Sequence, residues 1–158
     1  MTEQRTMAQT VLDGLDEVKA AVGRDLGTCD WMEITQERVD QFAEATGDHQ
    51  WIHVDPERAV AGPFGGTIAH GYLTLSLSNA FLPDIVEFRG VSMGINYGTG
   101  KVRFPAPVPV GSRIRGRATM QSVEDVADGV QTTIVITVEI EGNEKPGCVV
   151  ESLSRLYF

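Results

Sequence analysis

The sequence predicts an α+β protein in which one long apolar helix is covered by an antiparallel sheet. The segment Ile68–Leu82 is apolar nearly all round, as expected of a helix buried in a core. After Pro83, stretches that alternate apolar and polar residues dominate the chain, and this period of two is typical of strands. A buried helix followed by enough antiparallel sheet to wrap it gives the α+β class.

The chain before the long helix is predicted to hold shorter helices. An amphipathic helix is expected over about residues 7–22, because its apolar residues recur at helical spacing, and Gly23 would end it. A short extended segment, Trp31–Ile34, follows. The apolar residues of the first helix are Val11, Leu12, Leu15, Val18 and Val22.

A second helix is predicted between Thr35 and Gly47. Thr35 is a suitable N-cap, and Gly47 can supply the left-handed residue that ends a helix. A loop over residues 48–53 comes next. The pair Asp55-Pro56 then has the pattern of an N-cap and first helical position, which predicts a short helix to about Ala61.

The second half of the chain is predicted to form the sheet. No linker long enough to divide the chain occurs, so residues 1–158 are expected to form one domain. The turns between strands fall at Asp128-Gly129 and Gly142-Asn143. The expected strands are Val91–Tyr97, Lys101–Phe104, Ser112–Val126, Gln131–Glu141 and Val149–Tyr157.

Composition restricts the class of partner and the compartment. Thirteen Lys and Arg residues against 22 Asp and Glu give a formal net charge of −9, which disfavours nucleic acid and anionic membranes as main partners. The polar start of the chain does not have the pattern of a signal peptide, and the apolar segments are too short to span a bilayer. Cys29 and Cys148 are far apart, which favours free thiols in a reducing cytoplasm.

Two of the three histidines and two acids lie close together between Gly47 and Asp55. Because Gly47 ends a helix, the following loop can direct Asp48 and His53 to one point. A carboxylate and an imidazole are a suitable pair for acid–base catalysis. The alternative is structural: Asp48 would cap the loop, and His53 would bind backbone carbonyls.

A metal site is a second interpretation of the same segment. His49, His53 and Asp55 all carry ligand atoms, and histidines four residues apart bind metal when both lie on one helix. Gly47 and Pro56 leave little room for that helix, so the sequence disfavours a metal.

The start of the long helix offers a possible anion site. The first N–H groups of a helix have no partner within the helix and carry the positive end of its dipole, so the N–H of Gly71 could bind an oxyanion. In the alternative interpretation, Gly71 permits close packing and His70 is structural.

Taken together, these motifs closely resemble one enzyme family. The order Phe42-x-x-x-Thr46-Gly47-Asp48-x-x-x-x-His53-x-Asp55, then Gly66-Thr67-Ile68-Ala69-His70-Gly71, resembles the MaoC-like (R)-specific enoyl-CoA hydratases. The segment Val102–Gly111 resembles the strand and connector that follow in that family. The similarity covers roughly Gly27–Phe158.

The resemblance implies a hot-dog fold, in which a curved antiparallel sheet wraps a long central helix, and it implies a homodimer. It makes Asp48 and His53 the catalytic pair and the backbone N–H of Gly71 the oxyanion donor. The implied reaction is reversible addition of water to a trans-2-enoyl-CoA, giving an (R)-3-hydroxyacyl-CoA. No metal and no cofactor other than the CoA of the substrate is implied.

The chain departs from the family pattern at two places. Gln50-Trp51 occupies the loop where many members have Asn-Pro, and Asn79 stands where some members have a serine. Arg89, Lys101 and Arg103 are candidates to bind the CoA phosphates, or else they are solvated strand charges. Two rival functions stay open: a hot-dog acyl-CoA thioesterase, and a non-catalytic acyl-CoA-binding or assembly subunit.

Overall fold

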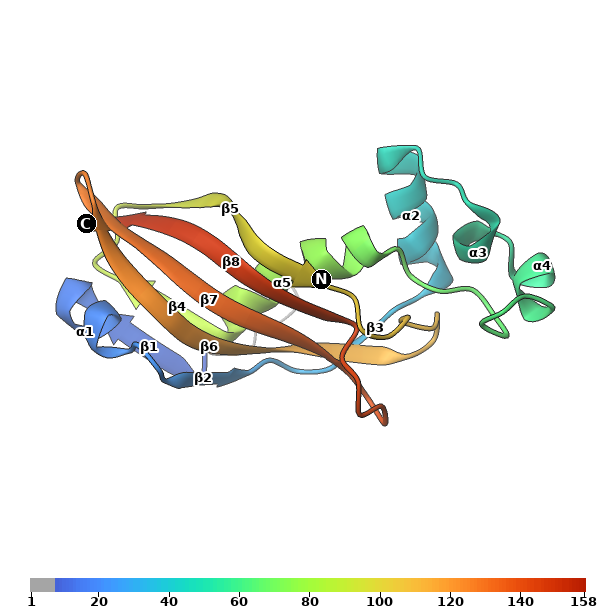
Figure 1. The fold of residues 1–158 in the computed structure, drawn as a ribbon, viewed down its shortest axis with the longest axis horizontal. Helices are drawn as coiled ribbons and strands as arrows, with labels where there is room; N and C mark the ends of the chain where they lie inside the picture. Colours follow the sequence, from blue (N-terminus) through green and yellow to red (C-terminus); the bar gives the residue numbers. More distant parts are fainter. Residues whose placement is uncertain (1–7) are drawn as a thin grey trace, which may run out of the picture.

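The structure, a computed structural model, describes residues 8–158. Within these residues there are five helices and eight strands, and the long strands come last in the chain (Figure 1). In chain order the elements are β1 (Thr10–Asp13), α1 (Gly14–Ala20), β2 (Asp25–Thr28), β3 (Met32–Glu33), α2 (Gln36–Thr46), α3 (Trp51–Val54), α4 (Pro56–Val60), α5 (Gly71–Ile85), β4 (Val86–Arg89), β5 (Met93–Arg103), β6 (Arg113–Val126), β7 (Gly129–Ile140) and β8 (Cys148–Tyr157).

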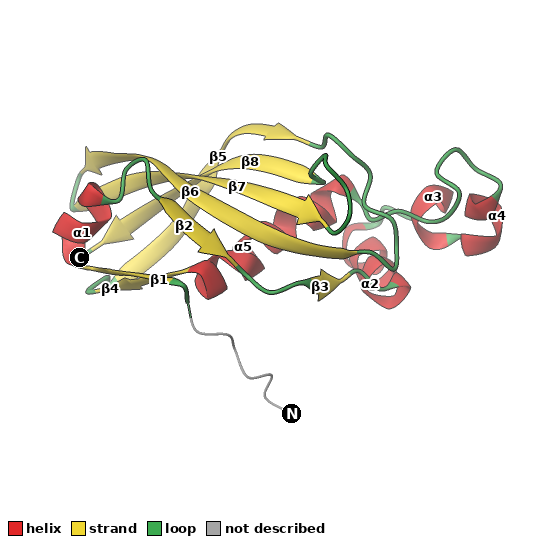
Figure 2. Ribbon diagram, turned by 90° about the horizontal axis from the view of Figure 1, so that it is seen from below, coloured by secondary structure: helices red, strands yellow, loops and turns green. Residues whose placement is uncertain are grey.

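The main sheet is antiparallel and curves over α5 (Figures 1 and 2). Its strand order is β2-β6-β7-β8-β5, with β3 pairing β6 beside β2. Strand β7 lies at its centre, and buried and partly buried residues alternate along the whole strand. The predicted hot-dog arrangement, an α+β fold with a sheet wrapped around a central helix, is confirmed.

The core lies between α5 and the concave face of the sheet. Leu73, Leu77, Phe81 and Ile85 repeat every four residues and form the buried stripe of the helix. Phe81 packs against Gly116 of β6, where an added Cβ would lie 2.9 Å from the Cβ of Phe81. The missing side chain at Gly116 therefore lets the helix approach the sheet closely.

Helix α5 differs from its prediction in both its ends and its burial. It begins at Gly71 because the N–H of Ile68 donates to Ile52 and that of Ala69 donates to Val108, which holds both residues in extended backbone. It continues past Pro83 to Ile85, whose side chain is fully buried. One face stays exposed, with Tyr72 70% accessible, so the helix is not buried all round in the single chain.

The N-terminal helix is shorter than predicted. Residues 10–13 form strand β1, which pairs in parallel with β4, and the helix covers only Gly14–Ala20. The alternating burial of β1 places Leu12 in the core, and Gly14 adopts a positive φ of 84° that separates strand from helix. The predicted start at residue 7 lies outside the described residues.

The expected strands 91–97 and 101–104 are one strand, β5, interrupted by two register shifts. It forms one edge of the main sheet, and nearly all its residues are exposed. The strands β6, β7 and β8 match their predicted ranges within about two residues.

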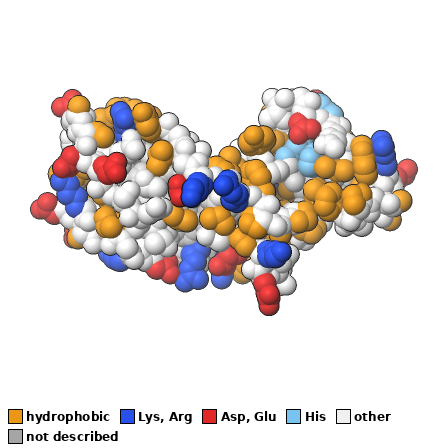
Figure 3. Space-filling model, in the orientation of Figure 1, with side chains coloured by type: hydrophobic (Ala, Val, Ile, Leu, Met, Phe, Trp, Pro, Cys, Tyr) orange, Lys and Arg blue, Asp and Glu red, His pale blue; other side chains and the backbone are white. Residues whose placement is uncertain are grey.

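Helices α2, α3 and α4 form a separate lobe near the N-terminal end of α5 (Figure 1). A hollow lies between this lobe and the sheet, and hydrophobic and histidine side chains line it (Figure 3). Within residues 8–158, no helix combines the length and apolar character needed to cross a bilayer.

Candidate active site

Helix α2 delivers Asp48 to the hollow. The Thr35 side chain caps the helix by accepting the N–H of Arg38, and Gly47 ends it with a φ of 81°, both as predicted. Asp48 follows in the loop with an exposed side chain, and its Oδ1 accepts the N–H of Gln50 at 3.3 Å.

His53 lies on the one-turn helix α3 and is buried, with 7% of its surface exposed. Its Nδ1 lies 2.7 Å from the carbonyl oxygen of Ile68. Because a carbonyl only accepts, Nδ1 carries the proton and donates, which leaves Nε2 with a lone pair. His53 is therefore oriented as a neutral base with one ring nitrogen free to accept a proton.

Hydrogen bonds of Gln36 connect the backbone of His53 to the segment before α5. The Nε2 of Gln36 donates to the His53 carbonyl at 2.7 Å, and its Oε1 accepts the Thr67 hydroxyl at 2.6 Å. The position of Gln36 in the first turn of α2 thus links three segments that are distant in the sequence.

Burial lowers the pKa of His53 below its ordinary value, since an apolar environment disfavours the charged imidazolium. The hydrogen bond to Ile68 and the charge of Asp48 act in the opposite direction but are weaker. The neutral form of His53 is therefore favoured near pH 7.

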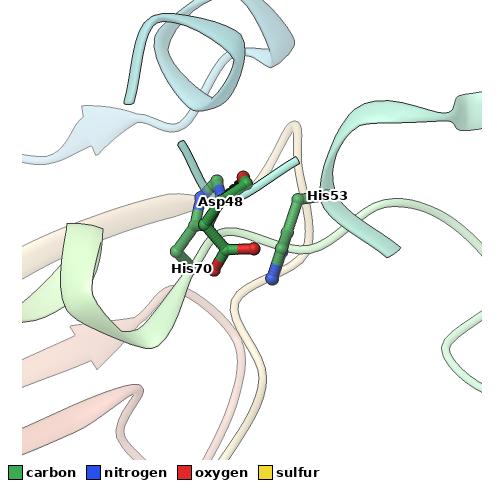
Figure 4. Close-up of side chains that lie close together, drawn as sticks. All are labelled: Asp48, His53 and His70. Carbon is green, nitrogen blue, oxygen red and sulfur yellow. Dashed lines mark hydrogen bonds between the residues drawn. The ribbon is translucent and has the colours of Figure 1, made fainter. Parts of the chain in front are cut away.

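The third histidine, His70, completes the cluster. Asp48, His53 and His70 each offer a ligand atom, and these atoms lie within 4.8 Å of one another. Figure 4 shows the Asp48 carboxylate and the His53 ring directed to a common space, with His70 beside them. The loop and α3 thus bring the predicted catalytic pair together.

A pocket of about 310 Å³ opens beside this cluster. His53 and Gly71 both line it, so the imidazole and the start of α5 border one cavity. A Cβ on Gly71 would lie 3.1 Å from the Phe104 ring, which supports the packing role of this glycine as well. The other lining residues are Phe64, Ile68, Ala69, Thr74, Phe104, Ala106, Pro107, Val108 and Gly147, most of them apolar.

The cluster is a poor metal site in its present geometry. The rings of His53 and His70 are stacked with centroids 3.9 Å apart and planes inclined by 24°. A metal ion lies in the plane of each imidazole that binds it, about 2.0–2.1 Å from the nitrogen, so two stacked rings cannot share one ion. One nitrogen of each ring also already contacts a backbone carbonyl.

The three residues considered as metal ligands from the sequence, His49, His53 and Asp55, do not form a metal site. The His49 Nε2 pairs with Glu44 at 2.7 Å on the exposed side of α2, and this partner raises the pKa of His49. Asp55 caps α4 by accepting the N–H of Arg58. The three side chains therefore do not converge.

The four residues proposed for substrate binding lie at different distances from the pocket. Arg103 of β5 directly precedes Phe104 in the pocket wall, and Lys101 lies two residues before it. Asn79 lines a second cavity, of about 280 Å³, between α5 and strands β5 and β8. Arg89 follows the far end of α5 and pairs with Glu87, so the single chain does not bring it to His53.

Sequence reasoning missed Gln36 and the part that His70 takes in the cluster. Both contacts join segments far apart in the chain, at separations of 17 and 22 residues. Polar residues in the first turn of a helix and at a helix start are common, so neither residue carried a signal of its own.

Comparisons with known proteins show the family of the chain. The model of the MaoC like domain matches residues 17–142. The chain is 56% identical over 144 residues to 3-hydroxyacyl-thioester dehydratase Z of Mycobacterium tuberculosis, covering 90% of this chain and 95% of that protein. It is 44% identical to Nodulation protein N of Rhizobium leguminosarum bv. viciae, with 91% of each chain covered.

A solved structure, the (R)-hydratase from A. caviae involved in PHA biosynthesis, matches with a TM-score of 0.71 at 23% identity and covers 85% of this chain and 96% of that one. At this identity the likeness concerns the fold. Because the family model matches most of the chain and a close relative matches nearly its whole length, the protein belongs to the MaoC-like dehydratase family.

Proposed function

We propose that the protein is an (R)-specific hydratase of enoyl thioesters, which catalyses reversible addition of water to a trans-2-enoyl-CoA to give an (R)-3-hydroxyacyl-CoA. The observation that carries the proposal is the convergence of Asp48 and His53 beside a pocket that Gly71 also lines. The dehydratase activity named for the relative that is 56% identical supports the same reaction in its reverse direction.

The geometry suggests a role for each group. A water molecule held between Asp48 and His53 would donate one proton to the free Nε2 of His53 as its oxygen attacks the β-carbon. The imidazolium would then return that proton to the α-carbon on the same face, so the net change is the addition of one water. Positioned acid–base catalysis of this kind contributes about 10²–10⁴-fold.

The oxyanion donor would be the N–H of Gly71. Negative charge develops on the thioester oxygen when hydroxide adds to the β-carbon, and the helix N-terminus favours that charge. A donor aimed at such a developing charge is worth roughly 3–4 kcal/mol in the transition state. The reaction needs no metal, and its only cofactor chemistry is the CoA carried by the substrate.

A homodimer is part of the proposal. Edge strand β5, the outer face of α5 and the segment after β5 leave large apolar side chains exposed, and an apolar sheet edge of this kind is normally covered. A second copy of the chain seated there would shield this surface. The exposed residues are Tyr72, Met93, Ile95, Tyr97 and Phe104.

Arg103 and Lys101 are the proposed contacts for the CoA phosphates, because they precede a pocket-lining residue and Arg103 has no carboxylate partner among the contacts described for it. Arg89 is a less suitable candidate for phosphate binding, since it forms an ion pair with Glu87. Asn79 is proposed to contact the acyl group through the second cavity.

The cytoplasm is the proposed compartment. Cys29 and Cys148 are both unpaired and buried, as the sequence predicted. Burial raises the pKa of the Cys148 thiol to about 11, so this group is a packing residue and not a nucleophile.

The deciding experiment combines two assays on the same purified protein. Crotonyl-CoA and longer enoyl-CoAs are followed by loss of enoyl absorbance, with chiral analysis of the product, and free thiol is measured in parallel. We expect loss of the enoyl group, an (R)-3-hydroxy product and no thiol. Thiol release without hydration would favour the thioesterase, and binding without turnover would favour a non-catalytic subunit.

A further inference from the structure

We propose that His70 is a positioning residue that fixes Asp48 and His53 relative to each other without exchanging a proton with the substrate. The proposal rests on the proposed hydratase function and assigns a part of the same site. It concerns the histidine that sequence reasoning took as merely structural.

His70 contacts both members of the pair by different parts of its ring. Its Nε2 lies 2.9 Å from the backbone carbonyl oxygen of Asp48. Its ring stacks on the ring of His53 with centroids 3.9 Å apart. The ring of Phe42 packs against His70 in a tilted orientation, with centroids 4.9 Å apart. A single side chain thereby links the Asp48 loop, helix α3 and the start of α5.

The contact with Asp48 matters because the other hydrogen bonds of this residue are long. The carboxylate accepts the N–H of Gln50 at 3.3 Å, and the N–H of Asp48 lies 3.5 Å from the Thr46 hydroxyl, which is at the limit of a hydrogen bond. The bond from His70 is the shortest that these contacts give to residue 48. It therefore sets where the loop, and with it the carboxylate, lies.

One ring nitrogen of His70 is hydrogen-bonded and the other is buried, so neither is available to exchange a proton with the substrate. A carbonyl oxygen only accepts, so Nε2 carries the proton and donates it to Asp48. The other nitrogen, Nδ1, is buried without a partner, and the whole residue is 2% exposed.

The stacked arrangement also assigns opposite tautomers to the two rings. His53 donates from Nδ1 and keeps its lone pair on Nε2, whereas His70 donates from Nε2 and keeps an unused lone pair on Nδ1. The reactive ring of His53 is thus stacked on a ring that is hydrogen-bonded to the backbone of Asp48.

Two substitutions separate the two contacts. His70→Phe keeps a flat ring against His53 but loses the bond to Asp48, whereas His70→Gln can keep an N–H at the same place but loses the stack. We expect each to lower kcat for enoyl-CoA hydration by roughly 10–100-fold, because small errors in position are costly in catalysis. The KM should change by less than about threefold, since His70 does not touch the substrate.

Double variants that combine a His70 substitution with one at Asp48 or His53 test whether His70 acts through these two residues. In an Asp48→Asn background, measured with enough enzyme to follow the residual rate, His70→Phe should cost less than about twofold more. In a His53→Gln background, the same should hold for His70→Gln. Equal costs in wild-type and changed backgrounds, or wild-type kcat in both His70 variants, would overturn the proposal.

A measurement on the unchanged protein tests the tautomers independently of activity. The chain has only three histidines, so ¹⁵N-histidine labelling and long-range nitrogen–proton spectra resolve each ring. We expect an Nε2–H pattern for His70 and an Nδ1–H pattern for His53. An Nδ1–H pattern for His70 would contradict the proposal even if the protein hydrates enoyl-CoA, and absence of hydration with the expected tautomers would instead count against the proposed function.

Discussion

At the scale of single residues, the site depends on one buried, neutral imidazole. His53 is held by its Nδ1 bond to Ile68 and by the bond from Gln36 to its carbonyl, so its orientation is fixed before any substrate binds. Catalytic geometry of this kind requires support from the neighbouring residues, because a misplaced base loses much of its effect.

The pH dependence follows from the lowered pKa of His53. Below this pKa the imidazole is protonated and cannot accept a proton from water, so the rate of hydration should fall as the pH falls. Because burial lowers the pKa of His53 below its ordinary value of 6.5, the midpoint of the acid limb should lie below 6.5. A pH profile of kcat/KM checks this, and a midpoint above 6.5 would contradict it.

The same shift links protonation to stability. The unfolded chain binds a proton at His53 at a higher pH than the folded protein does, so this group lowers the free energy of unfolding as the pH falls below 6.5. Denaturant titrations of wild type and His53→Gln should therefore diverge in their pH dependence below 6.5. Parallel curves would show that the histidine is not held neutral.

At the scale of elements, close approach between α5 and β6 is what allows the sheet to wrap the helix. Gly116→Ala would place a Cβ 2.9 Å from the Cβ of Phe81, between a buried strand and a buried helix. Overpacking of this kind costs about 1–3 kcal/mol. We expect the free energy of unfolding to fall by that amount in denaturant titrations.

A matched control is Gly66→Ala. An added Cβ at Gly66 meets no atom within 4 Å, and its backbone φ is not positive, so this change should be nearly neutral. If both variants are equally stable, the packing of α5 against β6 is not as tight as described.

The sequence predicted those elements whose signal is local. Thr35 and Gly47 bound α2 by capping, and the alternation along β7 gives its burial without knowledge of its neighbours. The strands β1, β2 and β4 were missed because each has four residues and depends on a distant partner for its pairing. The stacking of His70 on His53 could not be predicted for the same reason, because it also joins residues that are distant in the sequence.

At the scale of the whole molecule, the single chain leaves an apolar surface that a second copy would cover. The composition of α5 suggested burial on all sides, yet one of its faces and β5 are exposed in the single chain. A homodimer would reconcile the apolar character of these segments with their position at an edge of the fold.

A charged residue introduced into the proposed interface tests whether the dimer forms there. Ile95→Lys places a cation among the exposed apolar residues of β5, so it should convert a dimer into a monomer because a buried unpaired charge is costly. Sedimentation velocity should give twice the chain mass of 17.2 kDa for wild type and the chain mass for the variant. Val22→Lys changes an exposed residue after α1, outside the proposed surface, and should leave the dimer intact; a monomeric wild type would contradict the proposal.

The most direct test of the account compares two histidines four residues apart. His53→Gln and His49→Gln remove an imidazole from the same segment, but only His53 lines the pocket, while His49 pairs with Glu44 at the surface. In a crotonyl-CoA hydration assay, His53→Gln should lower kcat by roughly 10²–10⁴-fold and His49→Gln by less than about twofold. Equal turnover in the two variants would contradict the assignment of His53 as the base.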